Sequence, residues 1–391
     1  MTPKVRDRLI KQSPYDEDRI VRFAVRPFDV RFAYVDSTAK LWNEARGDYV
    51  RAWEIGRDAL LVRRRAPRSN DGAAFSLSPH LVDQHHLHKD AYAIPALLVN
   101  DLAGEGWDQL FPHENGEAVA RSWRPNLSRF AVAYLAELGI YDVASSRESA
   151  RLIWLHALAI GYSPLYLEEN SDAIGSNWPR IPLPPSAEEL WHSAALGAKI
   201  GALLDVDAPL PGLDTRPTPR LRHIAELTCD SGRQPASDDL VITAGWGRTQ
   251  TRKQPSGVAS RAIMPGKGRV VARARTAEEA SGLTASEISH LGAEVLDIYL
   301  NERTSWKGIP EAVWNYKVGG FQVLRKWLSY RESEILGRPL TFGEAREFRS
   351  IARRLTELVL AGPEFDANYR ASAGMVDQDP LPQLADVVGK D

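Results

Sequence analysis

The sequence predicts an α+β protein in which helical segments surround a β-containing region. Three observations favour this class. Short runs of β-branched and aromatic residues, bounded by turn-forming residues, are typical of strands. Longer segments with apolar residues three and four positions apart, preceded by Ser or Thr, are typical of helices. A stretch rich in proline and aspartate at 205–219 separates a helical section from later strand-like runs and is the best candidate for a domain boundary.

The first two expected strands cover residues 20–25 and 30–35. Between them, Arg26-Pro-Phe-Asp29 contains the proline and aspartate that are common in turns. Arg26 and Arg31 flank this turn, so a buried Arg–Asp pair that fixes it is the favoured interpretation, ahead of a contact with nucleic acid.

Two helices in the first half of the chain are expected from capping boxes, in which Ser is followed three positions later by Glu. Ser145 and Glu148 open a helix that runs to about residue 161. Ser186 and Glu189 open the next one, after a proline-rich segment that is expected to be extended.

Thr341 and Glu344 form a third capping box near the C-terminus. The apolar face of the helix that follows is formed by Ala345, Phe348, Ile351, Ala352, Leu355 and Leu358. The tail after Tyr369 has weak periodicity and is expected to be loose.

Further strands are expected at 240–243, 268–272 and 296–300. The chain is therefore divided into a junction segment at 1–144, a helical section at 145–205, a β-containing region at 206–320 and a C-terminal helical region at 321–391.

The segment 309–331 is the most informative part of the chain. Gly319 and Gly320 permit backbone angles, or a close approach, that other residues resist. After them, Phe321, Val323, Leu324, Trp327 and Leu328 repeat at helical spacing, which leaves Arg325, Lys326 and Arg331 toward other faces. A buried helix with cations reaching its surface is the plainer interpretation of the aromatic residues.

The composition is that of an ordinary globular protein, with 43% hydrophobic and 26% charged residues among 391. No apolar run has membrane-spanning length, and the polar N-terminus shows no secretory signal. The single Cys229 excludes an internal disulfide and any multi-cysteine zinc site, which fits a reducing cytoplasm. Because the net charge is only −2, a nucleic-acid role must depend on local basic patches.

The most basic stretch is 243–276, which contains eight Lys or Arg residues and no Asp or Glu. Such residues bind phosphates, and interspersed glycines allow close approach to a phosphate backbone. A solvated basic hairpin is the alternative. A second basic group lies at 63–68. The DNA-binding candidates are Arg63, Arg64, Arg248, Arg252, Lys253, Arg261, Lys267, Arg269, Arg273, Lys317, Arg325 and Lys326.

Three other patterns are weaker. His80, His85, His86 and His88, with Asp83 and Asp90, have no known metal-ligand spacing, so a solvated histidine-rich turn is favoured over a metal site. Gly104 and Gly106 follow an apolar run, as in a cofactor loop, but no amphipathic helix continues from them. Trp246 lies inside the basic stretch and is the tryptophan to test for DNA contact, although core packing is its default role.

Several motifs in order resemble the C-terminal target-recognition region of the single-polypeptide (Type ISP) restriction–modification enzymes, which methylate adenine in DNA. The motifs are Arg26-Pro-Phe-Asp29, residues 75–83 with 92–95, residues 162–166, residues 177–184, residues 313–331 and residues 340–344. Together they extend over nearly the whole chain.

The resemblance implies sequence-specific recognition of double-stranded DNA. The chain has no (Asp/Asn/Ser)-Pro-Pro-aromatic loop for an extruded adenine, no ATP-binding Gly-x4-Gly-Lys-(Ser/Thr) and no (Asp/Glu)-x-Lys nuclease pair. We therefore expect no catalytic, cofactor or metal residues in it. S-adenosylmethionine, ATP and Mg are implied for the intact enzyme only. The methyltransferase and helicase–nuclease would belong to another polypeptide or to a missing N-terminal part.

Two other hypotheses stay open at this point. A divergent S-adenosylmethionine-dependent methyltransferase would bind its cofactor at Gly104–Gly106. An interaction module without a DNA role would show little affinity for duplex DNA at any salt concentration.

Overall fold

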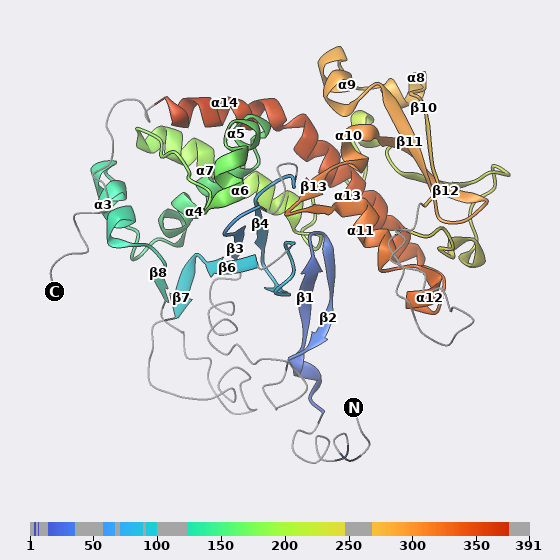
Figure 1. Ribbon diagram of the computed structural model, residues 1–391, viewed down its shortest axis with the longest axis horizontal. Helices are drawn as coiled ribbons and strands as arrows, with labels where there is room; N and C mark the ends of the chain where they lie inside the picture. The colour runs from blue at the N-terminus through green and yellow to red at the C-terminus, as the bar shows by residue number, and fades with distance from the viewer. Residues whose placement is uncertain are drawn as a thin grey trace.

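The computed structural model has the α+β fold that the sequence predicts (Figure 1). It describes residues 15–35, 58–66, 71–88, 91–99, 123–246 and 268–374, together with Lys4 and Asp7. Within these ranges, every helix is too short or too polar to cross a lipid bilayer.

Small sheets form the N-terminal part. A 3-10 helix (Glu17–Arg19) leads into β1, which pairs with β2 in an antiparallel hairpin and with β5 in parallel. A second sheet has the order β4-β3-β6, and β7 pairs with β8. The strands are β1 (Ile20–Arg26), β2 (Asp29–Tyr34), β3 (Ala59–Arg63), β4 (Phe75–Ser78), β5 (Leu81–Val82), β6 (Ala91–Pro95), β7 (Leu97–Val99) and β8 (Trp123–Pro125).

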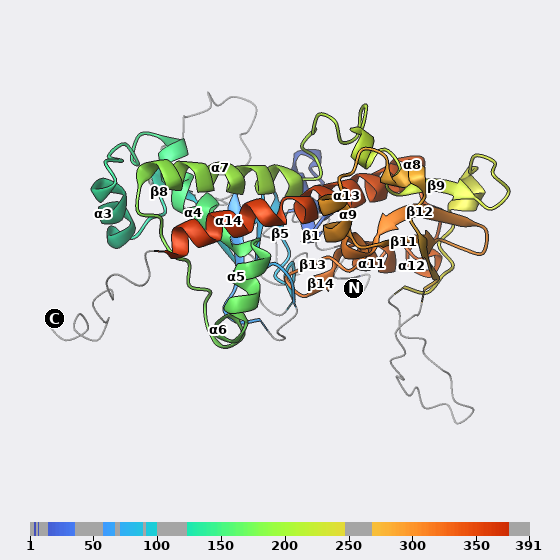
Figure 2. The same ribbon diagram turned by 90° about the horizontal axis from the view of Figure 1, so that it is seen from above.

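A helical layer covers one side of these sheets (Figure 2). Its members are α3 (Arg129–Glu137), α4 (Arg147–Gly161), α5 (Pro164–Glu169), α6 (Ser171–Ser176), α7 (Ala187–Leu204), α13 (Phe342–Leu360) and α14 (Gly362–Ala373). The α4 and α7 helices approach so closely at Gly197 that a Cβ atom there would lie 2.0 Å from the Leu155 carbonyl oxygen. In Figure 2, α14 and α13 follow one another across the molecule and connect the helical layer with the late sheet.

The late sheet is antiparallel, with the order β10-β11-β12-β9. Its strands are β9 (Glu226–Cys229), β10 (Val270–Ala274), β11 (Glu294–Tyr299) and β12 (Thr304–Pro310). Around it lie two 3-10 helices (Pro219–Leu221 and Ser237–Leu240), α8 (Ala277–Ala280), α9 (Ala285–Leu291) and α10 (Glu311–Trp314).

A short hairpin of β13 (Lys317–Val318) and β14 (Phe321–Gln322) follows, and then α11 (Val323–Ser329) and α12 (Ser333–Leu336). One apolar core connects the N-terminal sheets, the helical layer and the late sheet, and Leu61, Leu158, Ile298 and Phe348 are among its fully buried members. The sheets and helices that carry the candidate site therefore share one packed interior.

The strands predicted at 20–25, 30–35, 268–272 and 296–300 are confirmed by β1, β2, β10 and β11. The predicted capping box of Thr341 and Glu344 opens α13, and Ser186 caps α7.

Other predictions for secondary structure are wrong. The cap of α4 is Ser146, whose hydroxyl accepts the Ser149 N–H, because the Ser145 hydroxyl bonds the Asp142 carbonyl instead. The run at 240–243, in which Leu240 and Ile242 are buried, begins in a 3-10 helix and makes no strand, because the Asn301 side-chain amide binds the carbonyls on either side of Leu240. Helix α14 extends past Tyr369 to Ala373, so the predicted loose tail begins later than expected, and its residues after 374 lie outside the described part of the chain. The predicted domain boundaries stay predictions.

Candidate nucleic-acid interface

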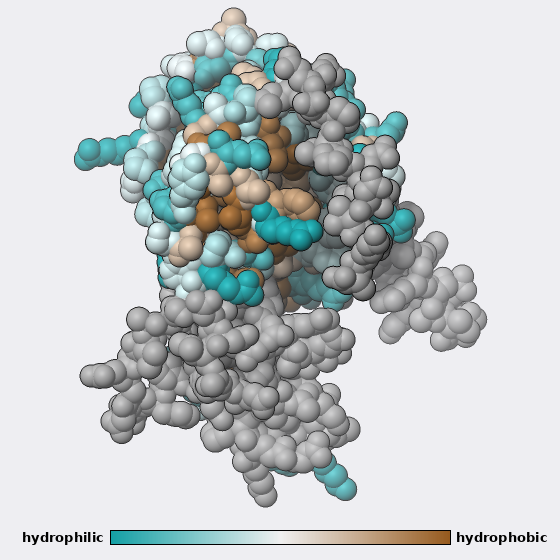
Figure 3. All heavy atoms as spheres, turned by 90° about the vertical axis from the view of Figure 1, so that its left-hand side faces the viewer, coloured by the Kyte–Doolittle hydropathy of each residue, from teal (hydrophilic) through white to brown (hydrophobic). Residues whose placement is uncertain are grey.

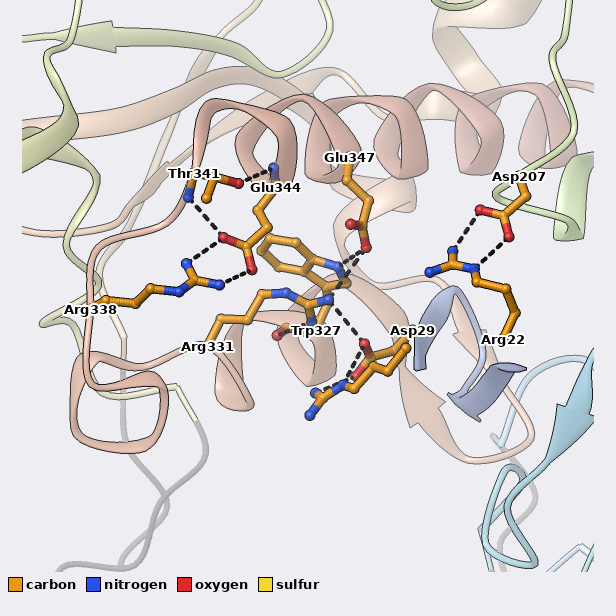
Figure 4. Close-up of polar contacts among 10 residues, drawn as sticks. Arg22, Asp29, Asp207, Trp327, Arg331, Arg338, Thr341, Glu344 and Glu347 are labelled. Carbon is orange, nitrogen blue, oxygen red and sulfur yellow. Dashed lines mark hydrogen bonds and ion pairs between the residues drawn. The ribbon is translucent and has the colours of Figure 1, made fainter. Parts of the chain in front are cut away.

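The buried carboxylate of Asp29 holds the β1–β2 turn in place through hydrogen bonds with two arginines (Figure 4). It is 1% exposed and accepts two hydrogen bonds from Arg31, at 3.1 and 2.8 Å, and one from Arg331, at 3.0 Å. Burial alone would raise the pKa of Asp29, but the hydrogen bond from Arg31 and the charge of Arg331 outweigh it and lower that pKa. Asp29 is therefore held as a buried anion.

Arg331 comes from the turn after α11 and lies flat over the Trp327 ring, 3.8 Å from its centroid. Its guanidinium also reaches Glu347 of α13 at 3.3 Å, and the Trp327 indole N–H donates to the same carboxylate at 2.8 Å (Figure 4). The predicted buried Arg–Asp pair thus exists, but Arg31 and the distant Arg331 form it. Arg26 pairs instead with Asp83, at 3.0 Å.

Three cations surround two aromatic rings on the surface above this buried pair. We call Arg26, Arg31, Lys326, Phe321 and Tyr330 the cation–aromatic cluster. Arg31 and Lys326 lie 5.0 and 4.4 Å from the Tyr330 centroid, while Arg26 and Lys326 lie 5.3 and 5.5 Å from that of Phe321. Each ring attracts the cations through its negative face, which orders their side chains without cancelling their charge.

Lys326 carries the excess positive charge of this cluster. Among the described residues, no carboxylate lies within ion-pair distance of its ammonium group, whereas Arg26 and Arg31 each have one. Arg325, its neighbour on α11, donates to the Trp246 carbonyl at 3.0 Å. Lys317 lies on β13, in the short hairpin that precedes α11. Lys317, Arg325 and Lys326 thus lie within the continuous segment of β13, β14 and α11, and of the three Lys326 belongs to the cation–aromatic cluster.

Two glycines shape the β13–β14 hairpin. Gly319 and Gly320 form the two-residue turn between β13 and β14, with φ values of 54° and 88°. A Cβ at Gly319 would lie 2.4 Å from the Leu87 Cδ2 atom, and one at Gly320 would lie 2.9 Å from the His88 Cβ atom. Both reasons predicted for glycine here, positive φ and close approach, are confirmed.

The two described parts of the basic stretch, 243–246 and 268–276, meet near α11. The Gly268 N–H donates to the Gly245 carbonyl, and Gly268 packs so closely on Trp246 that a Cβ would lie 2.2 Å from the ring. Arg269, the next residue, is exposed; its guanidinium lies 3.9 Å from the Tyr299 ring centroid. Trp246 itself is 1% exposed, which agrees with core packing, its default role, and leaves its ring unavailable for the DNA contact that was to be tested.

Two of the predicted DNA-binding residues, Arg63 and Arg273, form ion pairs with acidic side chains of the protein. Arg63 is 2% exposed and pairs with Asp71 at 3.2 Å, so burial excludes the phosphate contact predicted for it. Arg273 donates to both oxygens of Glu279, at 2.8 and 2.6 Å, and to Asp297 at 3.0 Å. Glu279 and Asp297 lie outside the acid-free stretch, Glu279 just after its end and Asp297 on the neighbouring strand β11, and they compensate the charge of Arg273.

Arg64 is exposed at the end of β3. The other five predicted DNA-binding residues lie outside the described residues, as do Gly104 and Gly106; the five are Arg248, Arg252, Lys253, Arg261 and Lys267.

The histidines do not form a metal site with one another. His86 is 3% exposed and bonds the Ala24 carbonyl, which corrects the prediction of a wholly solvated turn, whereas His85 is exposed. His80 instead lies 3.2 Å from Asp207 and 3.7 Å from Asp205. These three could hold a cation, but Arg22 already binds both Asp207 oxygens, at 2.8 and 2.6 Å (Figure 4).

A family model described as the Type ISP C-terminal specificity domain matches residues 1–343. No curated protein matches the chain. Among solved structures, it resembles the "ATP-dependent Type ISP restriction-modification enzyme LlaBIII bound to DNA", with a TM-score of 0.50 and 10% identity over 94% of this chain. It also resembles the "DrdV-DNA complex" solved by cryo-EM, with a TM-score of 0.51 and 18% identity over 94% of this chain. The chain spans 20% of the LlaBIII chain and 30% of the DrdV chain. At these identities the two likenesses describe the fold.

Proposed function

Because this chain belongs to the Type ISP C-terminal specificity domain family, we propose that it recognises a short, asymmetric sequence in double-stranded DNA. It would do so as the specificity part of an adenine-methylating restriction–modification system. The two structural relatives were solved in complexes with DNA, which supports DNA as the ligand class.

The cation–aromatic cluster is the observation that carries this proposal. Duplex DNA presents two rows of phosphates, and Lys and Arg that neutralise them release counterions, which provides affinity without regard to sequence. Lys326 suits such a contact because the aromatic rings hold its ammonium group in place and no described carboxylate neutralises it. The Arg31 side chain is 41% exposed, and its guanidinium lies beside the Tyr330 ring, which Lys326 also contacts.

The buried Asp29 supports the same proposal indirectly. Phosphate contacts fix the orientation of a protein on DNA only if the residues that make them are held rigidly. Arg331 joins the β1–β2 turn to α11 and α13 through a buried ion pair, so the cations of the hairpin and those of α11 keep one spacing. The network thereby positions the surface without contacting the ligand.

The proposal assigns recognition to this chain and chemistry elsewhere. Methylation with S-adenosylmethionine, and the steps that need ATP and Mg, would be carried out by a methyltransferase and translocating nuclease outside the 391 residues. This chain would position those activities at the target site.

A selection experiment tests the proposal. The purified chain is incubated with duplexes whose central positions are randomised, the bound fraction is recovered at moderate salt, and it is sequenced. We expect one asymmetric sequence to be enriched, and the affinity for it to fall steeply as salt rises. Retention of the library without any enriched sequence would leave a non-specific DNA binder. No retention at any salt concentration would refute a DNA role.

A further inference from the structure

Two exposed aromatic rings lie against each other on a different part of the surface. Tyr92 of β6 is 47% exposed and Trp178, which follows α6, is 40% exposed. Their ring centroids are 5.0 Å apart, with the planes tilted by 60°. Large aromatic side chains are usually buried in a protein core. Two such rings that stay this exposed and contact each other are therefore candidates for contact with a ligand.

The fold brings exposed arginines to the same place. In the β3–β6 pair, Val62 lies opposite Tyr92, so Arg64 and Arg65 follow directly after this point of the strand. The Ala66 N–H then donates to the Ile174 carbonyl of α6 at 2.8 Å, which ties the end of this arginine pair to the helix that precedes Trp178.

Three exposed arginines lie close to these rings along the chain or the paired strands. Arg64, Arg65 and Arg180 are all exposed, and in the part of the chain that the structure describes none of them has an ion-pair partner. Asp172 is the acidic residue of α6. Three arginines near two open aromatic rings match the combination by which proteins hold unpaired nucleotides, with bases stacked on the rings and phosphates near the cations.

We propose that Tyr92 and Trp178 form a stacking platform for an unpaired nucleobase of a DNA strand, with Arg64, Arg65 and Arg180 near the adjoining phosphates. The proposal depends on the proposed function only in taking DNA as the ligand. It concerns other residues than the cation–aromatic cluster, and another form of DNA.

The surroundings favour a nucleotide over a protein partner. A stable protein interface buries about 800 Å² on each side around an apolar centre. The residues that flank Trp178 in sequence include exposed Ser176, Asn177 and Arg180, so the platform is small and its rim is polar. By contrast, hydrophobic residues gather on the face shown in Figure 3, the side on which α3 carries exposed Phe130 and Val132.

The helix before Trp178 and the strand that carries Phe321 lie on the same side of the ribbon (Figure 2). In Figure 2, α6 and β14 both lie below the line of α14 and α13.

Binding of a fluorescein-labelled thymidine oligomer, about 12 nucleotides long, tests the platform in the full-length chain. A second oligomer of equal length has abasic sites in place of its bases. Trp178→Ala should lower the affinity for the thymidine oligomer by about 5-fold or more and leave that for the abasic oligomer unchanged. Tyr92→Ala should act in the same direction, and Trp178→Phe should restore most of the affinity. The double variant Arg64→Ala, Arg65→Ala should weaken binding of both oligomers.

Phe130→Ala, which removes an aromatic ring that is 63% exposed on α3, is the matched control and should change neither affinity. Circular dichroism of each variant shows whether it is folded. Wild-type affinity for the thymidine oligomer in folded Trp178→Ala and Tyr92→Ala variants would overturn the proposal. So would a wild-type chain that binds neither oligomer, which would point to a protein contact. Both results would leave the duplex selection, and therefore the proposed function, untouched.

Discussion

The Asp29 carboxylate and the Arg331 guanidinium form a buried ion pair at 3.0 Å, although 302 positions separate them in the sequence. Their side chains are 1% and 7% exposed. Through this pair the first hairpin of the chain contacts the helices of its last quarter. The relationship gives the Arg-Pro-Phe-Asp turn and the segment 309–331 a common structural role, which neither shows alone.

Arg331→Met should lower the free energy of unfolding by about 3 kcal/mol, because it removes one partner of a buried charge and leaves Asp29 with Arg31 alone. Urea denaturation followed by circular dichroism measures this change. Lys199→Met is the control, since Lys199 pairs with Glu364 on the surface, where each side chain is 47% exposed. That variant should stay within about 1 kcal/mol of the wild type. Equal losses in the two variants would show that the buried pair has no special weight.

The glycine turn gives a second prediction, on stability. Gly319→Ala should be destabilised by positive φ and, in addition, by the clash with Leu87. Gly232→Ala is matched to it, because Gly232 has φ of 72° but nothing within 4 Å of a Cβ. We expect the control to lose about 1 kcal/mol from backbone strain, and Gly319→Ala to lose at least about 1 kcal/mol more through overpacking. Thermal melts of both variants measure the difference, and similar melting temperatures would contradict the close approach.

Local features of the fold could be predicted from the sequence. The Gly319–Gly320 turn and the Thr341 cap depend on residues within a few positions of each other, so their pattern is visible in the chain itself. The run at 240–243 is the instructive failure. Leu240 and Ile242 are buried, but the Asn301 side chain, about sixty positions away, binds the carbonyls of this run in place of a neighbouring strand.

The candidate site was harder to predict because charges acquire partners only in three dimensions. Arg273 stands in an acid-free stretch, yet Glu279 and Asp297 enclose its guanidinium. Lys326 was predicted from its place on the helix of the segment 309–331, and it has no such partner among the described residues. Tyr330, the ring on which three cations converge, had no signal in the sequence beyond its place beside Arg331.

Two buried histidines predict a loss of stability in acid. Burial lowers the pKa of His86 and of His156 from 6.5 to about 4, although a backbone carbonyl bonded to each ring opposes the shift. The neutral His156 ring donates from Nε2 to the Pro182 carbonyl and accepts from the Ser193 hydroxyl, both at 2.7 Å. Since the unfolded chain binds these protons first, the stabilisation is complete above about pH 6.5 and is lost as the pH falls toward about 4.

His156→Gln should therefore flatten the dependence of stability on pH. Between about pH 7.5 and pH 4.5, its free energy of unfolding should fall by about 2 kcal/mol less than that of the wild type. Its stability at neutral pH should be lower, because glutamine cannot reproduce both hydrogen bonds of the ring. His85→Gln replaces an exposed histidine and should leave the pH profile unchanged. Parallel profiles for wild type and His156→Gln, from urea denaturation at several pH values, would show that His156 does not titrate on unfolding.

Lys326→Ala should weaken binding of duplex DNA several-fold without unfolding the chain, because Lys326 offers phosphates a half-buried cation that is ordered by Phe321 and Tyr330. One lost phosphate contact should also reduce the slope of log affinity against log salt by about 1. Fluorescence anisotropy with a labelled duplex, repeated across a salt series, measures both quantities. Lys199→Ala removes the same charge from α7 and should change neither, since the net charge of the two variants is equal. An unchanged slope in Lys326→Ala would mean that α11 does not face the DNA backbone, and the cation–aromatic cluster would then have to be read as a structural contact between the first hairpin and α11.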